Sequence, residues 1–156
     1  QAAKALQDEL LNPSMSFDED TSLLSAETKL AQNAKKVALM VLGTAAQKYM
    51  MALSEQQEVL MNCADIIMDA YQMETAILGE GAAGRYIDMA SVYCNDAIQG
   101  VDAKAKNTIA AISEGDEGRT LLVALKRFTK NNSPVNTIAA RQRIADVMIA
   151  ANTYTY

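Results

Sequence analysis

Apolar residues recur at three- and four-residue steps along most of the chain, which is the period of an amphipathic helix rather than of a strand. The clearest case is Ser54–Leu78. Ser54 and Gln57 form a capping-box pattern, which predicts that this helix begins at Ser54. Its expected buried face consists of Val59, Cys63, Ile66, Ile67, Ala70, Met73 and Ile77. We expect this helix to lie at the centre of the fold.

The same period predicts further helices on both sides of the central one. Two of them are long, one from about Ser22 or Ser25 to Leu53 and the other over Arg85–Ser113. Shorter helices are expected over Gln1–Leu11 and from Asp116 or Glu117 to Lys130. A polar, acidic loop is expected over Ser14–Thr21.

The last predicted helix begins at Ser133, because serine followed by proline is typical of an N-cap and a first helical position. It runs to about Ala151. Its expected buried residues are Ile138, Ile144, Val147 and Met148. Arg141 and Arg143 are expected to face water.

Gly43 lies in the middle of the long helix that ends at Leu53. A glycine in a helix interior costs about 1 kcal/mol relative to alanine. We therefore expect another helix to approach closely at this position and offset that cost.

Short connections between long helices predict antiparallel neighbours. Half of the residues are hydrophobic but only 5% are aromatic, and Ala, Leu, Ile and Met dominate, which favours helices. We predict an all-α fold, an up-and-down antiparallel bundle of three long helices with two shorter C-terminal helices and a short N-terminal helix. These elements are expected to form a single domain over residues 1–156.

The run from Gly79 to Gly84 matches the G-x-G-x-x-G pattern of dinucleotide-binding proteins. In those proteins a β-strand precedes the first glycine, and the phosphates bind at the N-terminus of the next helix. Here the preceding residues have a helical period, so we interpret the glycines as a helix–helix connection with a C-cap. A nucleotide-binding enzyme stays an alternative that requires a strand before Gly79.

The formal net charge of −5 argues against a sequence-independent grip on nucleic acid. The basic residues Lys126, Arg127 and Lys130 are expected at a helix C-terminus, where they complement the macrodipole. The longest uncharged run, Val37–Gln47, is shorter than the roughly 20 residues that span a bilayer. Cys63 and Cys94 are expected to be buried free thiols in a reducing compartment, which favours a soluble, cytoplasmic protein.

Candidate chemistry is sparse. The chain has no histidine, which excludes imidazole acid–base catalysis and the Glu-x-x-His di-iron sites of helical bundles. Asp65 and Asp69 lie four residues apart and are expected to be a solvated edge rather than a metal site. The acidic run Asp18–Asp20 lacks the spacing of a calcium loop. Glu74 falls near the apolar side of the central helix.

We expect a structural ion pair for Glu74, and its candidate partners are Arg85, Arg119 and Lys126. We also predict four partly buried tyrosines, whose rings lie in the core and whose hydroxyls reach the edge: Tyr49, Tyr71, Tyr86 and Tyr93. No residue is predicted to be catalytic, to bind a cofactor or to bind a metal.

Several segments, taken in order, resemble the C-terminal extension of acyl-CoA dehydrogenases of the very-long-chain type. They are Ala3–Leu6, Lys35–Lys36, Thr44–Tyr49, Glu55–Met61, Ala64–Ile67, Met73–Leu78, Arg119–Leu122, Arg127–Thr129 and Asn136–Ala139. The resemblance covers nearly the whole chain, although members of the family usually have a longer segment between Leu78 and Ile87.

The resemblance implies a helical appendage of a homodimeric flavoenzyme of fatty-acid β-oxidation. The catalytic glutamate and the FAD-binding segments of that family lie upstream of the part that this chain resembles. No catalytic or FAD-binding residue is therefore carried over, and the implied partner is an upstream flavin domain. The chain begins with Gln1 inside a predicted helix, which favours a piece of a longer protein.

Two points remain open at the level of sequence. In mitochondrial members of the family this appendage is linked to membrane association, but the acidic balance and the lack of a basic amphipathic face argue against that here. The alternative function is a free-standing helical module that binds an unrelated partner through an exposed apolar surface. The residues that precede Gln1 in the full reading frame would distinguish the two functions.

Overall fold

The computed structural model describes residues 24–79 and 84–153, and within these ranges it contains helices and no strand. The elements are α2 (Ser25–Tyr49), the 3₁₀ helix η1 (Met50–Glu55), α3 (Gln57–Leu78), α4 (Gly84–Ile112), α5 (Gly115–Phe128) and α6 (Thr137–Ala151). The all-α class is confirmed. The predicted helix over Gln1–Leu11 and the loop over Ser14–Thr21 lie outside the described residues.

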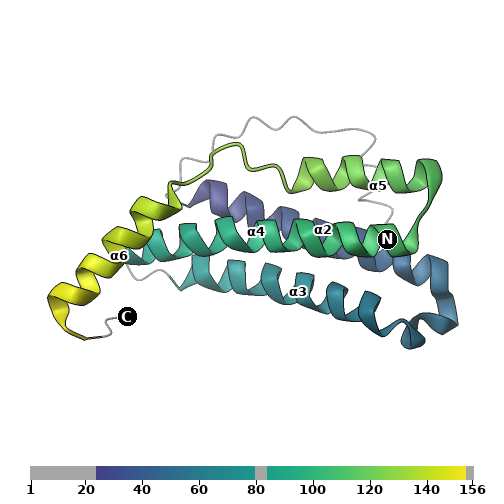
Figure 1. Cartoon of the computed structure of the whole chain (residues 1–156), viewed down its shortest axis with the longest axis horizontal. Helices are drawn as coiled ribbons and strands as arrows, with labels where there is room; N and C mark the ends of the chain where they lie inside the picture. The colour runs from purple at the N-terminus through teal and green to yellow at the C-terminus, as the bar shows by residue number, and fades with distance from the viewer. Residues whose placement is uncertain (1–23, 80–83, 154–156) are drawn as a thin grey trace.

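Helices α2, α3 and α4 lie side by side and contact one another in all three pairs (Figure 1). Near the N-termini of α2 and α4, the Ser91 hydroxyl donates a hydrogen bond to the Glu27 carboxylate. Near their C-termini, the Lys48 ammonium donates to the Ala111 carbonyl. These helices are thus parallel. Helix α3 is antiparallel to both, because η1 reverses the chain before it. The predicted up-and-down order of the three long helices is confirmed. The expected central place of the Ser54–Leu78 helix is wrong, because α4 contacts all four other α-helices and α3 lies at an edge of the bundle.

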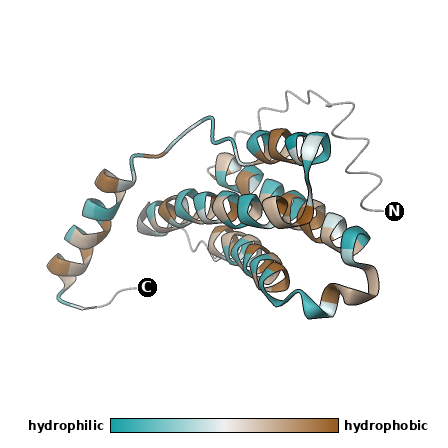
Figure 2. Ribbon diagram, turned by 45° about the vertical axis from the view of Figure 1, so that its right-hand side comes forward, coloured by the Kyte–Doolittle hydropathy of each residue, from teal (hydrophilic) through white to brown (hydrophobic). Residues whose placement is uncertain are grey.

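The shorter helices occupy two different places. Helix α5 packs on α4 and α2, along the edge of the bundle away from α3 (Figure 1). Helix α6 contacts α4 and leans away from the rest of the bundle (Figure 2). Only Ala140 of α6 is buried.

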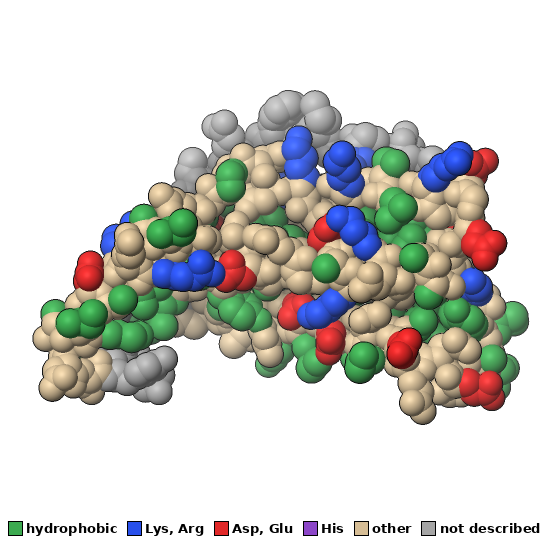
Figure 3. Space-filling view, viewed as in Figure 1, with side chains coloured by type: hydrophobic (Ala, Val, Ile, Leu, Met, Phe, Trp, Pro, Cys, Tyr) green, Lys and Arg blue, Asp and Glu red, His purple; other side chains and the backbone are tan. Residues whose placement is uncertain are grey.

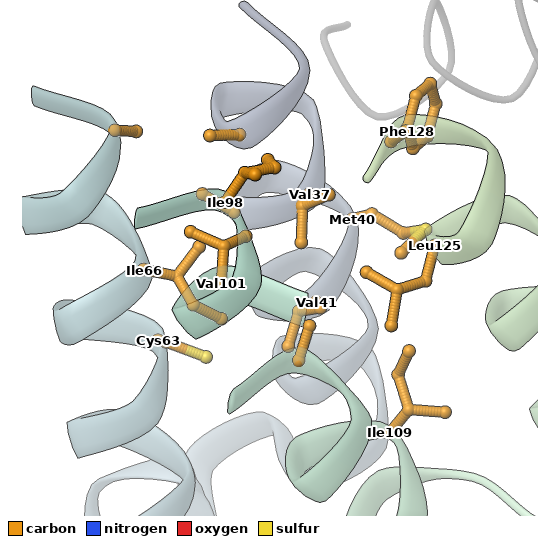
Figure 4. Close-up of a cluster of buried hydrophobic side chains, with 14 of the residues drawn as sticks. Val37, Met40, Val41, Cys63, Ile66, Ile98, Val101, Ile109, Leu125 and Phe128 are labelled. Atoms are coloured by element: carbon orange, nitrogen blue, oxygen red, sulfur yellow. The ribbon is translucent and has the colours of Figure 1, made fainter. Parts of the chain in front are cut away.

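The core lies between α2, α3, α4 and α5. Figure 4 shows the side chains of Val37 and Val41 from α2 close to those of Ile66 from α3 and Val101 from α4, and Leu125 approaches from α5. Small residues let the backbones come near one another, since four alanines in these helices are almost completely buried: Ala34, Ala45, Ala70 and Ala105. The apolar residues that recur at three- and four-residue steps in α2, α3 and α4 therefore form this core.

The predicted capping box at Ser54 is wrong. Ser54 lies inside η1, and α3 begins at Gln57 without a side-chain hydrogen bond at its N-cap, Gln56. The backbone N–H of Gln56 donates instead to the Leu53 carbonyl at 3.0 Å. Leu53 packs against the core, and this contact holds the chain in a 3₁₀ turn past the serine.

The predicted start and buried face of the last helix are also wrong. Helix α6 begins at Thr137, and its N-cap is Asn136, whose side chain accepts a hydrogen bond from the Ala139 N–H at 3.1 Å. The residues predicted to be buried are partly or largely exposed, and Ile138 is 68% exposed. Periodicity alone did not reveal that α6 meets a single neighbouring helix.

No described helix makes the expected close approach at Gly43. A Cβ atom added to Gly43 would meet nothing within 4 Å apart from its immediate surroundings in α2. We therefore predict that Gly43→Ala raises the free energy of unfolding by about 0.5–1 kcal/mol, because alanine loses less conformational entropy on folding. Urea denaturation followed by circular dichroism measures this.

The matched control is Gly115→Ala. Gly115 has a φ of +60°, a conformation that costs a residue with a side chain about 1–2 kcal/mol. We expect this variant to lose stability. A loss of stability in Gly43→Ala as well would contradict the open surroundings of Gly43.

One described stretch, Ser25–Glu55, is long and apolar enough to cross a membrane by length and composition alone. The sequence criterion of an uncharged run did not identify it, because charged residues interrupt the stretch, from Glu27 near its start to Lys48 near its end. Core helices of soluble proteins meet the same criterion, and α2 buries nine residues in the bundle.

The glycine-rich run connects two helices. Helix α3 ends at Leu78, and the N–H of Gly79 donates to the Thr75 carbonyl at 2.9 Å. Helix α4 begins at Gly84. The interpretation as a helix–helix connection is confirmed, and the strand that a dinucleotide site requires before Gly79 is replaced by α3.

Candidate functional site

The carboxylates of α3 belong to the packing of the bundle. The Lys104 ammonium of α4 pairs with Asp69 at 2.6 Å, so Asp69 is not the solvated residue that the sequence predicts. Asp65 is partly exposed. Among the described residues, no group of three acidic, cysteine or histidine side chains could hold a metal ion.

Glu74 is paired, but with a residue that sequence reasoning did not consider. The Lys35 ammonium of α2 donates to Glu74 Oε1 at 2.6 Å, and both side chains are about half exposed. Of the predicted partners, Arg119 pairs with Asp116, one turn before it in α5. The antiparallel packing of α2 on α3 brings Lys35 beside Glu74, and the sequence alone does not specify that register.

Cys63 and Cys94 are free, buried thiols, as predicted. Burial raises the pKa of the Cys63 thiol above its ordinary value. Burial, with a smaller contribution from the Glu27 carboxylate, raises the pKa of Cys94 to about 12. Because the thiolate is the reactive form, neither side chain is suited to act as a nucleophile.

We predict that both thiols react slowly with maleimide in the folded chain. A pKa of about 12 in place of 9.0 lowers the thiolate fraction of Cys94 roughly a thousandfold at neutral pH. Unfolding in urea should restore reaction at the rate of a free thiol. Rapid modification of the folded chain under native conditions would contradict the burial of the two residues.

Two ion pairs tie α6 to α4. Arg141 pairs with Asp96 at 2.5 Å, and Arg143 makes two hydrogen bonds to Asp88, at 2.8 and 2.5 Å. Both arginines remain more than half exposed, as the sequence predicts. The Arg143 guanidinium holds the pKa of Asp88 below its ordinary value, chiefly through the hydrogen bonds.

This depressed pKa predicts a pH dependence of the α4–α6 contact. The contribution of Asp88 is present above its unfolded pKa of about 4 and is lost as the pH falls through the lower folded value. We expect Arg143→Gln to return the pKa of Asp88 toward its ordinary value, as measured by NMR titration of the carboxyl carbon. Arg141→Gln is the matched control and should leave the titration of Asp88 unchanged.

Within residues 24–79 and 84–153, an apolar stripe is exposed along the outer side of α3. Met61, Met68, Tyr71 and Leu78 are each more than half exposed and follow one another at steps of seven, three and seven residues. Ile67 borders them and is also exposed, so its predicted burial is wrong. We call these five residues the α3 surface. Green side chains gather along this lower edge of the molecule in Figure 3.

Sequence reasoning did not identify this surface because Tyr71 and Ile67 were predicted to lie in the core. The spacing alone carries a signal, since a second apolar stripe runs along α3 beside the buried one. Beside Tyr71 lies a shallow hollow of about 350 Å³, lined also by Gln72, Thr75, Ala76 and Tyr93. The Tyr93 hydroxyl donates to Gln72, which fixes one wall of the hollow.

A second hollow contains three lysines. A groove of about 570 Å³ lies between α4 and the end of α5 and contains Lys106, Lys126 and Lys130. Lys106 pairs with Asp102, whose other oxygen accepts from the Thr129 hydroxyl at 3.0 Å. Lys126 lies in the last turn of α5, as predicted for a residue that complements the helix dipole.

The family model described as "Acyl-CoA dehydrogenase, C-terminal domain" matches residues 33–127, which include most of the core and α3 with its exposed stripe. The chain belongs to this family. A probable acyl-CoA dehydrogenase of Bacillus subtilis is 33% identical over 162 aligned residues that cover 98% of the chain. The predicted resemblance to C-terminal domains of acyl-CoA dehydrogenases is confirmed, and the very-long-chain type stays a prediction.

A solved structure extends the similarity to the fold. The crystal structure of an acyl-CoA dehydrogenase from Bacillus anthracis complexed with FAD superposes with a TM-score of 0.88 at 36% identity, over 99% of this chain. The chain spans 27% of the length of that protein and 27% of the Bacillus subtilis relative. This C-terminal domain thus corresponds to about a quarter of each relative.

Proposed function

We propose that this chain is a non-catalytic accessory domain of a longer FAD-dependent acyl-CoA dehydrogenase that acts on long-chain fatty acyl-CoA in β-oxidation. The observation that carries the proposal is the 27% coverage of two relatives, of which both are named acyl-CoA dehydrogenases and one is complexed with FAD. The long-chain substrate rests on the family resemblance of the sequence.

Neither of the two hollows described above has the features of a flavin site. A flavin site needs a concave pocket with apolar or aromatic walls for the ring system and a few placed polar groups. The groove between α4 and α5 is open and lined mainly by lysine and amide side chains, and the hollow beside Tyr71 is shallow. We therefore assign FAD and the dehydrogenation of the acyl chain to the remainder of the longer polypeptide.

The contacts of the candidate residues support a structural role for this chain. Asp69 and Glu74 form ion pairs with lysines of neighbouring helices, and the two thiols are buried. An accessory domain needs a stable fold and a surface that meets its partner. The bundle provides the first, and the α3 surface is a candidate for the second.

The test is a dehydrogenase assay with a dye as electron acceptor. The intact product of the reading frame should reduce the dye when long-chain acyl-CoA is added, and the 156-residue chain alone should not. Dye reduction by the chain alone would overturn the proposal. A reading frame that encodes nothing beyond this chain would instead favour the free-standing interaction module.

A further inference from the structure

We propose that the α3 surface is the face on which the remainder of the same polypeptide packs. This inference rests on the proposed function, because it requires a longer protein. It goes further by assigning the contact to five residues, Met61, Ile67, Met68, Tyr71 and Leu78, and by specifying the chemistry of the facing surface.

Helix α3 is apolar on two sides. One stripe of the helix is buried against α2 and α4: Val59, Cys63, Ile66, Ala70 and Met73. The α3 surface lies outside this stripe and contains large side chains that are each close to or above half exposed. A surface helix with a single covered face normally has polar residues on its outer side, and contiguous exposed apolar residues mark an interaction site.

The α3 surface has a shallow hollow beside Tyr71. Tyr71 stands at the edge of the shallow hollow that Gln72, Thr75, Ala76 and Tyr93 complete. The wall made by Tyr93 is fixed by its hydrogen bond to Gln72. A hollow beside an exposed aromatic ring can receive one apolar side chain of a partner, which is the arrangement that carries most of the binding energy in protein interfaces.

The charged residues of α3 are all acidic. Helix α3 contains four acidic residues and no lysine or arginine. Asp69 and Glu74 are paired with lysines of α4 and α2, whereas Glu58 and Asp65 have no ion-pair partner among residues 24–79 and 84–153. The facing surface should therefore be apolar in the middle and carry Lys or Arg beside Glu58 and Asp65.

The acidic residues of α3 also favour the remainder of the polypeptide over a second copy of this chain as the partner of the α3 surface. The α3 surface of a second copy would bring the same unpaired acids and no basic residue of α3. The remainder of the longer polypeptide, which is nearly three quarters of the length of each relative, provides a different surface that is joined to this chain covalently. A covalent link raises the effective concentration of that partner, so a modest apolar interface is sufficient.

The experiment measures thiol accessibility in the intact protein. Cys63 and Cys94 are buried, and peptide mass spectrometry follows labelling at the introduced cysteine separately from any cysteine in the rest of the protein. We compare Met68→Cys on the α3 surface with Val123→Cys on α5, residues that are 51% and 71% exposed in the bundle and lie on opposite edges of it. Each maleimide rate is divided by the rate of the same variant in urea.

We expect Met68→Cys to be labelled about tenfold or more slowly than Val123→Cys in the intact protein, because the packed remainder covers position 68. Equal normalised rates would overturn the inference. Protection of Met68→Cys that disappears on dilution, as the protein dissociates to monomers, would assign the surface to a second copy and would also overturn it. Flavin absorption of the same samples tests the proposed function separately, because a flavin-containing protein with equal rates retains that function and loses only this docking site.

Discussion

Ile66→Ala is expected to lower the free energy of unfolding of the chain by about 2–5 kcal/mol. The Ile66 side chain is fully buried, and it lies at the centre of the cluster where α2, α3 and α4 meet. Truncation removes apolar contacts and leaves a cavity that rigid neighbouring helices fill only in part. Urea denaturation followed by circular dichroism at the helix signal measures the change.

The next residue in the sequence provides the control. Ile67 has the same side chain on the same helix but is 47% exposed. Ile67→Ala should cost less than about 1 kcal/mol, since half of its surface already faces water. Equal losses in the two variants would contradict the orientation of α3 in the bundle.

The second large effect is expected from overpacking. Ala105 of α4 is completely buried in the core cluster, where neighbouring side chains surround its small methyl group. Ala105→Leu should destabilise the chain by about 1–3 kcal/mol, because the added methylene and methyl groups force neighbouring side chains or helices apart. The same denaturation experiment measures this loss.

Ala103→Leu is the matched control for this variant. Ala103 lies two residues earlier on α4 and is exposed. Leucine and alanine have similar helix propensities, so this variant should keep its stability within about 0.5 kcal/mol. A loss as large as that of Ala105→Leu would show that the exposed side of α4 is packed.

The long helices could be predicted from sequence because their pattern and their packing agree. Cys63, Ile66 and Met73 were predicted to be buried from three- and four-residue spacing, and all three lie in the core. The helix–helix interpretation of Gly79 was likewise sound, because it relied on the period of the preceding residues. Local sequence is sufficient where a helix has one apolar face and that face is covered within the chain.

The features that were not predicted depend on which helix faces pack against each other in the folded chain. The pairing of Glu74 with Lys35 follows from the register of α2 against α3, which spacing within one helix does not encode. The α3 surface was missed because an apolar pattern does not indicate whether a face is covered inside the chain or by another part of the protein. Ile138 of α6 is exposed for the same reason, since α6 contacts α4 on one side only.

These features fit one account of the molecule. The ion pairs and buried core residues stabilise the bundle, and five large apolar side chains, Met61, Ile67, Met68, Tyr71 and Leu78, remain exposed along the outer side of α3. An accessory domain of a flavoenzyme is expected to have this distribution, with its chemistry elsewhere in the polypeptide and a surface for contact with it.

We propose that FAD binds to a part of the longer protein that lies outside this chain. The most direct measurement is limited proteolysis of the intact, purified protein, with separation of the fragments and the flavin absorption spectrum of each. We predict that all FAD stays with the larger fragment and that the fragment containing α2 to α6 is colourless after incubation with FAD and gel filtration. Flavin bound to the fragment with α2 to α6 would contradict the account.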